Sequence, residues 1–216
     1  MTFLLLFGLT SGVGAKVHVA SQLETRRTRN EPASIVAEIV LLERLLNADQ
    51  GARCVASIDI ARSTAMKANQ DPLAVEWSFR EYHTLLAECA ADAGGQVMST
   101  SGDGAVLTFS DCEDALMAAK DIQTKLSWFN QKVNRLDSPF RARIGLHTGE
   151  VGGELEDVQF THVIDIAAHV QALAPVGGIL VSEKVVEKVT NEKFSELKDP
   201  VDDIKVFLVV NPTLGA

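Results

Sequence analysis

Apolar residues recur along this chain in two patterns, which together predict an alternation of strands and helices. Apolar residues spaced three or four apart predict helices, whereas short apolar runs bounded by Gly, Asp or Ser predict strands. After residue 50 the predicted strands are 54–60, 96–101, 104–109 and 140–147, and the predicted helices are 72–92, 111–133 and 161–174. The first six elements have the order β-α-β-β-α-β, which predicts an α/β (α+β) fold of the ferredoxin-like type.

This order also predicts how the strands pair. In the split βαβ arrangement the third strand lies antiparallel between the first two strands, which are parallel to each other. A tight hairpin turn is expected at Gly102-Asp103, because such a turn needs a residue with positive φ. The carboxyl end of the first strand, where Asp59 lies, should therefore lie beside Asp103 at the start of the third strand.

The expected proximity of Asp59 and Asp103 has a chemical consequence. Two neighbouring carboxylates repel each other unless one is protonated or a cation bridges them, and hard oxygen ligands favour Mg²⁺ or Mn²⁺ carrying a phosphate. The adjoining segment 60–64 should turn into a helix and offer N–H groups and hydroxyls to an anion. The alternative is that Asp103 is only a turn residue and Asp59 only a helix N-cap.

Residues 1–31 form an apolar and then basic N-terminal segment. Its apolar stretch is shorter than the ~20 residues that a membrane helix needs, and no basic region precedes it as in a secretory signal. The later cluster of Arg26, Arg27 and Arg29 would suit the cytoplasmic end of a membrane anchor that begins before this chain. A buried strand or a frayed terminus is the alternative interpretation.

Residues 32–50 are predicted to connect this segment to the domain at 51–216. Pro32 is placed for the first turn of a helix, and Ile35, Ile39, Leu42 and Leu46 follow at spacings of a two-heptad seam. Such a seam favours pairing with another helix, but further apolar residues widen it enough for packing on the domain itself.

The amino-acid composition argues against some classes of binding function. The 216 residues carry 20 Lys and Arg against 29 Asp and Glu, and this net charge of −9 argues against nucleic-acid binding. The three cysteines have no metal-type spacing and lie in apolar runs, so buried free thiols in a reducing, cytoplasmic compartment are expected. His83 and His162 have no partner at metal-ligand spacing, so surface histidines are expected.

Five spaced motifs carry a family resemblance. They are the segments 55–60 (VASIDI), 94–95 (GG), 101–104 (SGDG), 143–151 (RIGLHTGEV) and 177–182 (GGILVS). In this order the motifs resemble the class III adenylate/guanylate cyclase catalytic domain, from about residue 54 to residue 209. The agreement of five motifs in register is far more specific than any one of them.

The resemblance implies a metal-dependent nucleotide site at a dimer interface. Asp59 and Asp103 would hold two metal ions, Mg²⁺ or Mn²⁺, on a nucleoside triphosphate, with the carbonyl of Ile60 as a further ligand. Ser63 and Thr64 would contact the phosphates. The family dimerises head to tail, so a homodimer, or a heterodimer with a complementary cyclase chain, is expected.

The positions that the family uses on the nucleoside side are substituted here. Ser99 occupies the position of a base-contacting lysine, and Val158 that of the second base-reading residue. Asp165 replaces an asparagine that orients the ribose, and His169 replaces an arginine that stabilises the transition state. A carboxylate and a mostly neutral imidazole are unfavourable exchanges opposite an anionic substrate. They indicate either an altered acid/base pair or substrate, or the relics of a weakened site.

The resemblance therefore implies conversion of a nucleoside triphosphate to a 3′,5′-cyclic nucleotide and pyrophosphate. Two alternatives remain open: a catalytically inactive regulatory or dimerisation module, or the metal-side half of a heterodimeric cyclase. The expected location is the cytoplasm, with the N-terminal segment as the candidate for attachment to the cytoplasmic face of a membrane.

Overall fold

The computed structural model describes residues 51–151, 156–198, 200 and 202–210, so the predictions for segments 1–31 and 32–50 lie outside the described residues. Its strands form one sheet. The strands are β1 (Gly51–Ile60), β2 (Gln96–Ser101), β3 (Gly104–Phe109), β4 (Ala142–Val151), β5 (Ile179–Ser182), β6 (Phe194–Glu196) and β7 (Val206–Val209). The helices are α3 (Ser63–Lys67), α4 (Pro72–Asp92), α5 (Cys112–Lys132), α6 (Glu156–Leu173) and α7 (Glu183–Val186).

The predicted ferredoxin-like core is confirmed. Strands follow the spatial order β2-β3-β1-β4-β5-β7-β6, so β3 lies between β1 and β2 as expected. β1 pairs antiparallel with both β3 and β4, and β3 pairs antiparallel with β2. The sheet extends beyond this core, because β5 joins β4 in parallel and is followed by β7 and β6.

Most predicted bounds agree with the structure, and the differences lie at the ends of elements. α5 is flanked by Asp111, whose side chain caps the helix by accepting from the N–H of Glu113 at 2.7 Å. β1 and β4 are longer than predicted because they pair along their whole length, from Gly51 opposite Val151 to Ile60 opposite Ala142. The apolar pattern does not detect these polar and glycine-rich ends.

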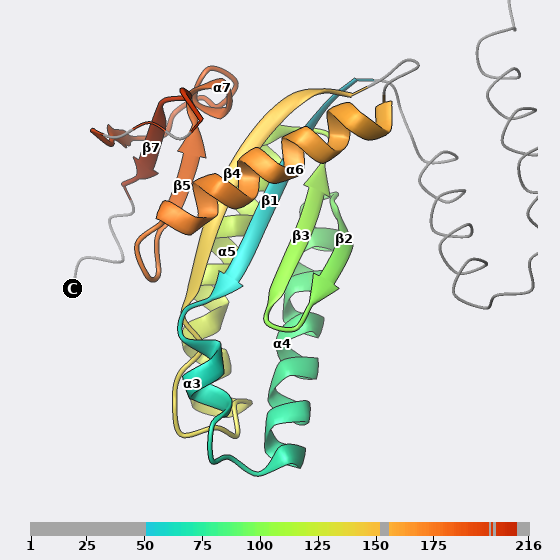
Figure 1. Cartoon of the computed structure of the whole chain (residues 1–216), viewed down its shortest axis with the longest axis vertical. Coiled ribbons are helices and arrows are strands. Elements are labelled where there is room, and N and C mark those ends of the chain that lie inside the picture. The colour runs from blue at the N-terminus through green and yellow to red at the C-terminus, as the bar shows by residue number, and fades with distance from the viewer. Residues whose placement is uncertain (1–50, 152–155, 199, 201, 211–216) are drawn as a thin grey trace, which may run out of the picture. The chain divides into compact units, whose positions relative to one another are not determined.

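Helices cover both faces of the sheet (Figure 1). α4 and α5 pack behind it over the largest apolar cluster, which includes the even-numbered residues of β1 from Cys54 to Ile60. α6 crosses the other face, where Val55 of β1 packs with Val163 and Ala167. Because side chains alternate along a strand, Asp59 points to the face that carries α6.

Two glycines of β4 allow α6 to approach this closely. A Cβ at Gly145 would lie 2.2 Å from the backbone nitrogen of Gln171 and 2.5 Å from the carbonyl oxygen of Ala167. A Cβ at Gly149 would lie 2.6 Å from the side chain of Val163. The glycines of the 143–151 motif therefore set the distance between the sheet and α6.

His147 of the same motif is buried in the core. Its Nδ1 lies 2.9 Å from the hydroxyl of Ser182 and so links β4 to β5. Burial, followed by the charges of Lys184 and His162, lowers the pKa of His147 to about 4.

The three cysteines are free and buried, as predicted. None of the described helices is long and apolar enough to cross a membrane.

Candidate functional site

Asp59 and Asp103 lie together at one end of the sheet. Ile58 pairs with Ala105 and Ser101 with Gly104, so the turn that carries Asp103 is directly beside the end of β1. Gly102 has a φ of 62°, which provides the left-handed residue that the two-residue turn requires. The Asp59 carboxyl group acts on the pKa of Asp103, so the two groups lie close together, and the exposed fractions of their side chains are 29% for Asp59 and 25% for Asp103.

Each carboxylate has its own basic neighbour. Arg143 lies opposite Asp59 on β4, and its Nη2 donates to Asp59 Oδ2 at 2.6 Å. The Nζ of Lys67, on α3, lies 3.9 Å from Asp103 Oδ1 and 4.2 Å above the ring of Phe79. These cations offset the repulsion between the two carboxylates, which allows both to lie at the same end of the sheet.

The surroundings of Asp103 favour its ionised form. Partial burial acts to raise the pKa of Asp103, but the Ser63 hydroxyl, the turn backbone and the charge of Lys67 together hold that pKa below its usual range. Asp103 is therefore a carboxylate near neutral pH, as a ligand for a hard cation must be.

The segment after β1 brings the remaining metal-side and phosphate-side candidates to this end of the sheet. The side chain of Ile60 is buried in the core, so only its backbone carbonyl can serve the site. Arg62 adopts a φ of 60° and directly precedes α3. Ser63 is buried and bonds to Asp103, whereas Thr64 is exposed and is the freer of the two hydroxyls for an anion.

α4 contributes two residues for which sequence reasoning gave no role in this site. Tyr82 is fully buried, and its hydroxyl has no hydrogen-bond partner among the described residues. Burial, and then the charges of Asp59 and Asp103, raise the pKa of Tyr82 well above its usual value. His83 is half-buried rather than on the surface as predicted, and burial, then the charge of Lys67, lowers its pKa. Only the folded structure reveals that this turn of α4 lies near Asp59 and Asp103, the acid pair of this site.

The substituted nucleoside-side positions lie on β2 and α6. Ser99 is exposed on β2. Val158 is in the first turn of α6, and its side chain lies outside the described part of the structure. Asp165 and His169 are one turn apart on α6, and both are exposed. Among these positions, the structure therefore places Asp165 and His169 on one exposed helix face.

His169 has a partner that the sequence did not reveal. Its Nδ1 lies 2.5 Å from Oδ2 of Asp202, in the turn before β7. The hydrogen bond with Asp202, then the charges of Asp202 and Asp165, raise the pKa of His169. A carboxylate that the sequence pattern did not place beside His169 thus favours the charged form of its imidazole.

The donor set at Asp59 and Asp103 suits a cation that is shared with a ligand. No group of three or more His, Cys, Asp or Glu side chains within the described residues could hold a metal ion alone. Two carboxylates and the Ile60 carbonyl leave coordination positions for phosphate oxygens and water, which is the usual arrangement for Mg²⁺ on nucleotides.

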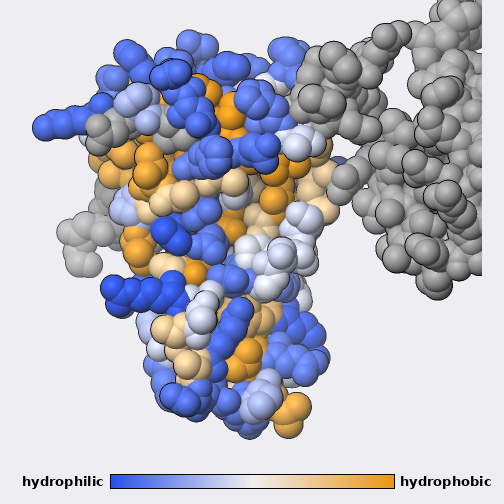
Figure 2. Space-filling model, in the orientation of Figure 1, coloured by the Kyte–Doolittle hydropathy of each residue, from blue (hydrophilic) through white to orange (hydrophobic). Residues whose placement is uncertain are grey.

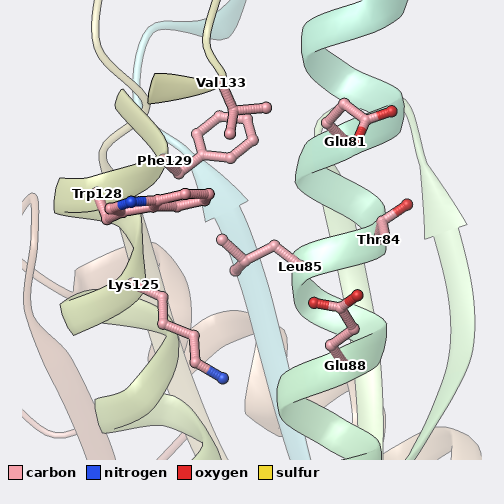
Figure 3. A pocket seen from close by; sticks show the side chains of 8 residues that line it. All are labelled: Glu81, Thr84, Leu85, Glu88, Lys125, Trp128, Phe129 and Val133. Atoms are coloured by element: carbon pink, nitrogen blue, oxygen red, sulfur yellow. The ribbon is translucent and has the colours of Figure 1, made fainter. Parts of the chain in front are cut away.

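A groove of about 450 Å³ lies elsewhere, between α4 and α5 (Figure 3). Leu85 of α4 and Trp128 and Phe129 of α5 form apolar walls, and Glu81 and Glu88 lie along its α4 side. None of the candidate site residues lines this groove, so it is separate from the acid pair.

On the face of the domain that carries α6, patches of hydrophobic residues lie between hydrophilic ones (Figure 2).

Known proteins resemble this chain in both sequence and fold. A Rhizobium meliloti protein with the name "Putative adenylate cyclase 3" is 28% identical over 95 residues, which are 44% of this chain and 16% of that protein. The chain thus matches a small part of that relative's length.

Two solved structures extend the comparison to the fold. The adenylate/guanylate cyclase/hydrolase from Silicibacter pomeroyi has a TM-score of 0.59 and 27% identity, covering 76% of this chain and 99% of that one. The adenylyl cyclase CyaB from P. aeruginosa has a TM-score of 0.66 and 16% identity, covering 76% of this chain and 95% of that one.

The sequence also matches a catalytic-domain family over most of its length. The family is described as the adenylate and guanylate cyclase catalytic domain, and the match extends over residues 48–206. This range contains the acid pair, the Arg143 motif and α6. The chain therefore belongs to the adenylate and guanylate cyclase catalytic domain family.

Proposed function

We propose that this domain converts a nucleoside triphosphate to a 3′,5′-cyclic nucleotide and pyrophosphate with two Mg²⁺ or Mn²⁺ ions. The observation that carries the proposal is the proximity of the Asp59 and Asp103 carboxyl groups at one end of a cyclase-family sheet. Two adjacent acidic side chains with open coordination positions are suited to holding metal ions on a triphosphate.

In this proposal, the residues at this end of the sheet have separate roles in binding metal, binding phosphate and balancing charge. Asp59, Asp103 and the Ile60 carbonyl would hold the ions, which when bound activate the ribose 3′ hydroxyl and offset charge on the phosphates. Ser63 orients Asp103 through its hydrogen bond, and Thr64 offers an exposed hydroxyl to a phosphate. Arg143 and Lys67 balance the carboxylates before the substrate arrives.

The nucleoside-side residues belong to a second protomer in this proposal. Asp165 and His169 are exposed on α6, where a partner's nucleotide can meet them. A homodimer carries Ser99, Val158, Asp165 and His169 at both of its sites. The base-reading positions are the substituted Ser99 and Val158, so the assay includes all four common nucleotides.

A second candidate rests on the exposed carboxylate of Asp165. A negative charge at a ribose-orienting position opposes an anionic substrate, and this favours a regulatory module or the metal-side half of a heterodimer. In the heterodimer, the partner chain supplies an asparagine and an arginine at these positions. This candidate keeps the metal-side residues but predicts no turnover by the chain alone.

Turnover by the purified chain tests the proposal. ATP, GTP, CTP and UTP are each supplied with Mn²⁺, and cyclic product and pyrophosphate are measured together. We expect product from at least one nucleotide and none with Asp59→Asn, while Asp92→Asn, an exposed substitution at the far end of α4, retains activity. Product that persists in Asp59→Asn contradicts the proposed site. If no nucleotide reacts, restoration by a cyclase chain with the asparagine and arginine supports the heterodimer.

A further inference from the structure

The turn at Asp202 and Asp203 is built to hold Asp202 against α6. Asp202 has a φ of 48° and Asp203 a φ of 63°, so two successive non-glycine residues adopt the left-handed conformation. Asp tolerates this conformation better than most L-residues, so the turn can form without glycine. The result of this turn is the 2.5 Å contact between Asp202 Oδ2 and His169 Nδ1.

The contact leaves the other ring nitrogen of His169 available. Nδ1 is used by Asp202, and the His169 side chain keeps 59% of its exposure, so Nε2 can reach a ligand outside the domain. A carboxylate on one ring nitrogen fixes the ring orientation and stabilises the imidazolium, whose second N–H then points outward as a donor. Among the described residues, the charged groups that act on His169 are Asp202 from the turn and Asp165 from α6 itself.

We propose that His169 and Asp202 form a dyad that presents an imidazolium N–H, through Nε2, to the reacting phosphate in the nucleotide site of a second copy of this chain. This inference rests on the proposed function. The His169 imidazolium supplies positive charge at the position where the family has an arginine. His169 is then a catalytic residue, and Asp202 is a positioning residue that acts through it. No proton needs to be transferred, because the imidazolium donates a hydrogen bond to a phosphate oxygen and keeps its charge.

This arrangement predicts that turnover depends on the charge of His169. Turnover should fall as the pH rises through the pKa of His169, which Asp202 and Asp165 raise. Asp202→Asn removes the stabilising carboxylate, so the fall should move to lower pH and kcat near neutral pH should decrease about tenfold. His169→Ala should decrease kcat about a hundredfold, which is the usual effect of losing one donor to a transition-state oxyanion.

The experiment is a pH series of kcat and KM for wild type, Asp202→Asn, His169→Arg and the double variant, with Mn²⁺ and the reactive nucleotide. In His169→Arg the fall with pH should disappear, and Asp202→Asn should then change kcat less than twofold. Asp203→Asn is the matched control, because Asp203 belongs to the same left-handed turn but is not among the groups that raise the pKa of His169. A structural role for Asp202 would instead lower kcat equally in both backgrounds.

The outcomes separate this inference from the proposed function. If wild type makes product but Asp202→Asn keeps the wild-type pH profile, or His169→Ala keeps the wild-type kcat, the dyad is overturned and the cyclase function stands. If wild type makes no product from any nucleotide, the proposed function fails and the dyad fails with it. Both side chains are exposed, so thermal melts of every variant should match wild type.

Discussion

At the scale of single residues, charge balance is the feature that organises the candidate site. Arg143 donates a hydrogen bond to Asp59 from the neighbouring strand. Ser63 bonds to Asp103, and Lys67 lies near it. Asp202 forms a hydrogen bond with His169. Sequence reasoning identified the two aspartates and His169 as candidates, but it assigned no role to Arg143, Lys67 or Asp202. These three lie on other elements, and only folding brings them to their partners.

His147 provides a residue-scale test of the core. The pKa of His147 is lowered to about 4 from 6.5, so the unfolded chain binds a proton that the folded chain does not. This contribution to stability is fully present above pH 6.5 and is lost as the pH falls from 6.5 towards 4. Between pH 7.5 and pH 5 the free energy of unfolding should decrease by about 2 kcal/mol through this residue.

Urea unfolding of wild type and His147→Gln over this pH range checks the prediction. Glutamine can still bond to Ser182 but does not titrate, so the variant should lose about 2 kcal/mol less on acidification. His162→Gln should alter the pH dependence only slightly, because the charge of His162 is the smallest of the three causes that lower the pKa of His147. Equal pH dependence in wild type and His147→Gln would show that His147 titrates normally in the folded protein.

At the scale of elements, the approach of α6 to β4 positions Asp165 and His169. α6 lies over Gly145 and Gly149 because neither glycine has a side chain to hold it away. His169 is two residues before Gln171, whose backbone lies closest to Gly145. The glycine spacing of the motif is therefore a packing requirement that also fixes where the His169–Asp202 contact forms.

Gly145→Ala tests this packing. The added Cβ would meet backbone atoms of α6 at 2.2 to 2.6 Å, and side-chain rotation cannot relieve contacts with backbone. We expect the free energy of unfolding to decrease by about 2–3 kcal/mol, the usual effect of overpacking a well-packed interior. Gly104→Ala, whose Cβ would meet its nearest atom at 3.4 Å, should change it by less than about 1 kcal/mol. Urea unfolding measures both, and similar losses would contradict the close-approach argument.

At the scale of the whole molecule, strand order brings the acid pair together. Asp59 and Asp103 are far apart in the sequence, and they meet because β3 lies directly beside β1. Any other placement of the β2–β3 hairpin would separate them. The same sheet places α6 on the face toward which Asp59 points, and α4 and α5 on the opposite face (Figure 1).

Metal and nucleotide should stabilise the whole domain even without turnover. A ligand that binds only the folded state at a hundred times its Kd adds about 2.7 kcal/mol to the free energy of unfolding. We expect Mn²⁺ with a non-cyclisable ATP or GTP analogue to raise Tm by several degrees in wild type, and to raise it much less in Asp103→Asn. Asp165→Asn, outside the metal side, should retain the shift. Thermal melts that show the same shift in Asp103→Asn would place the ligand elsewhere.

The sequence by itself determined the core topology, most element bounds and the acid pair. Hydrophobic periodicity reports which face of an element is buried, and Gly102-Asp103 marks a turn, so local signals were sufficient for β1 to β4, α4 and α5. The resemblance added the substituted positions Ser99, Val158, Asp165 and His169, whose roles stay predictions.

Only the tertiary structure decided which groups meet. Asp202 reaches His169 through a left-handed turn, and Arg143 reaches Asp59 through strand register. Tyr82 and His83 approach the acid pair only because α4 packs behind the sheet. These pairings depend on contacts between residues distant in sequence, and hydrophobic periodicity carries no information about them. The ionisation of His169 is likewise a tertiary property, because the carboxylate that stabilises its charge comes from another part of the fold.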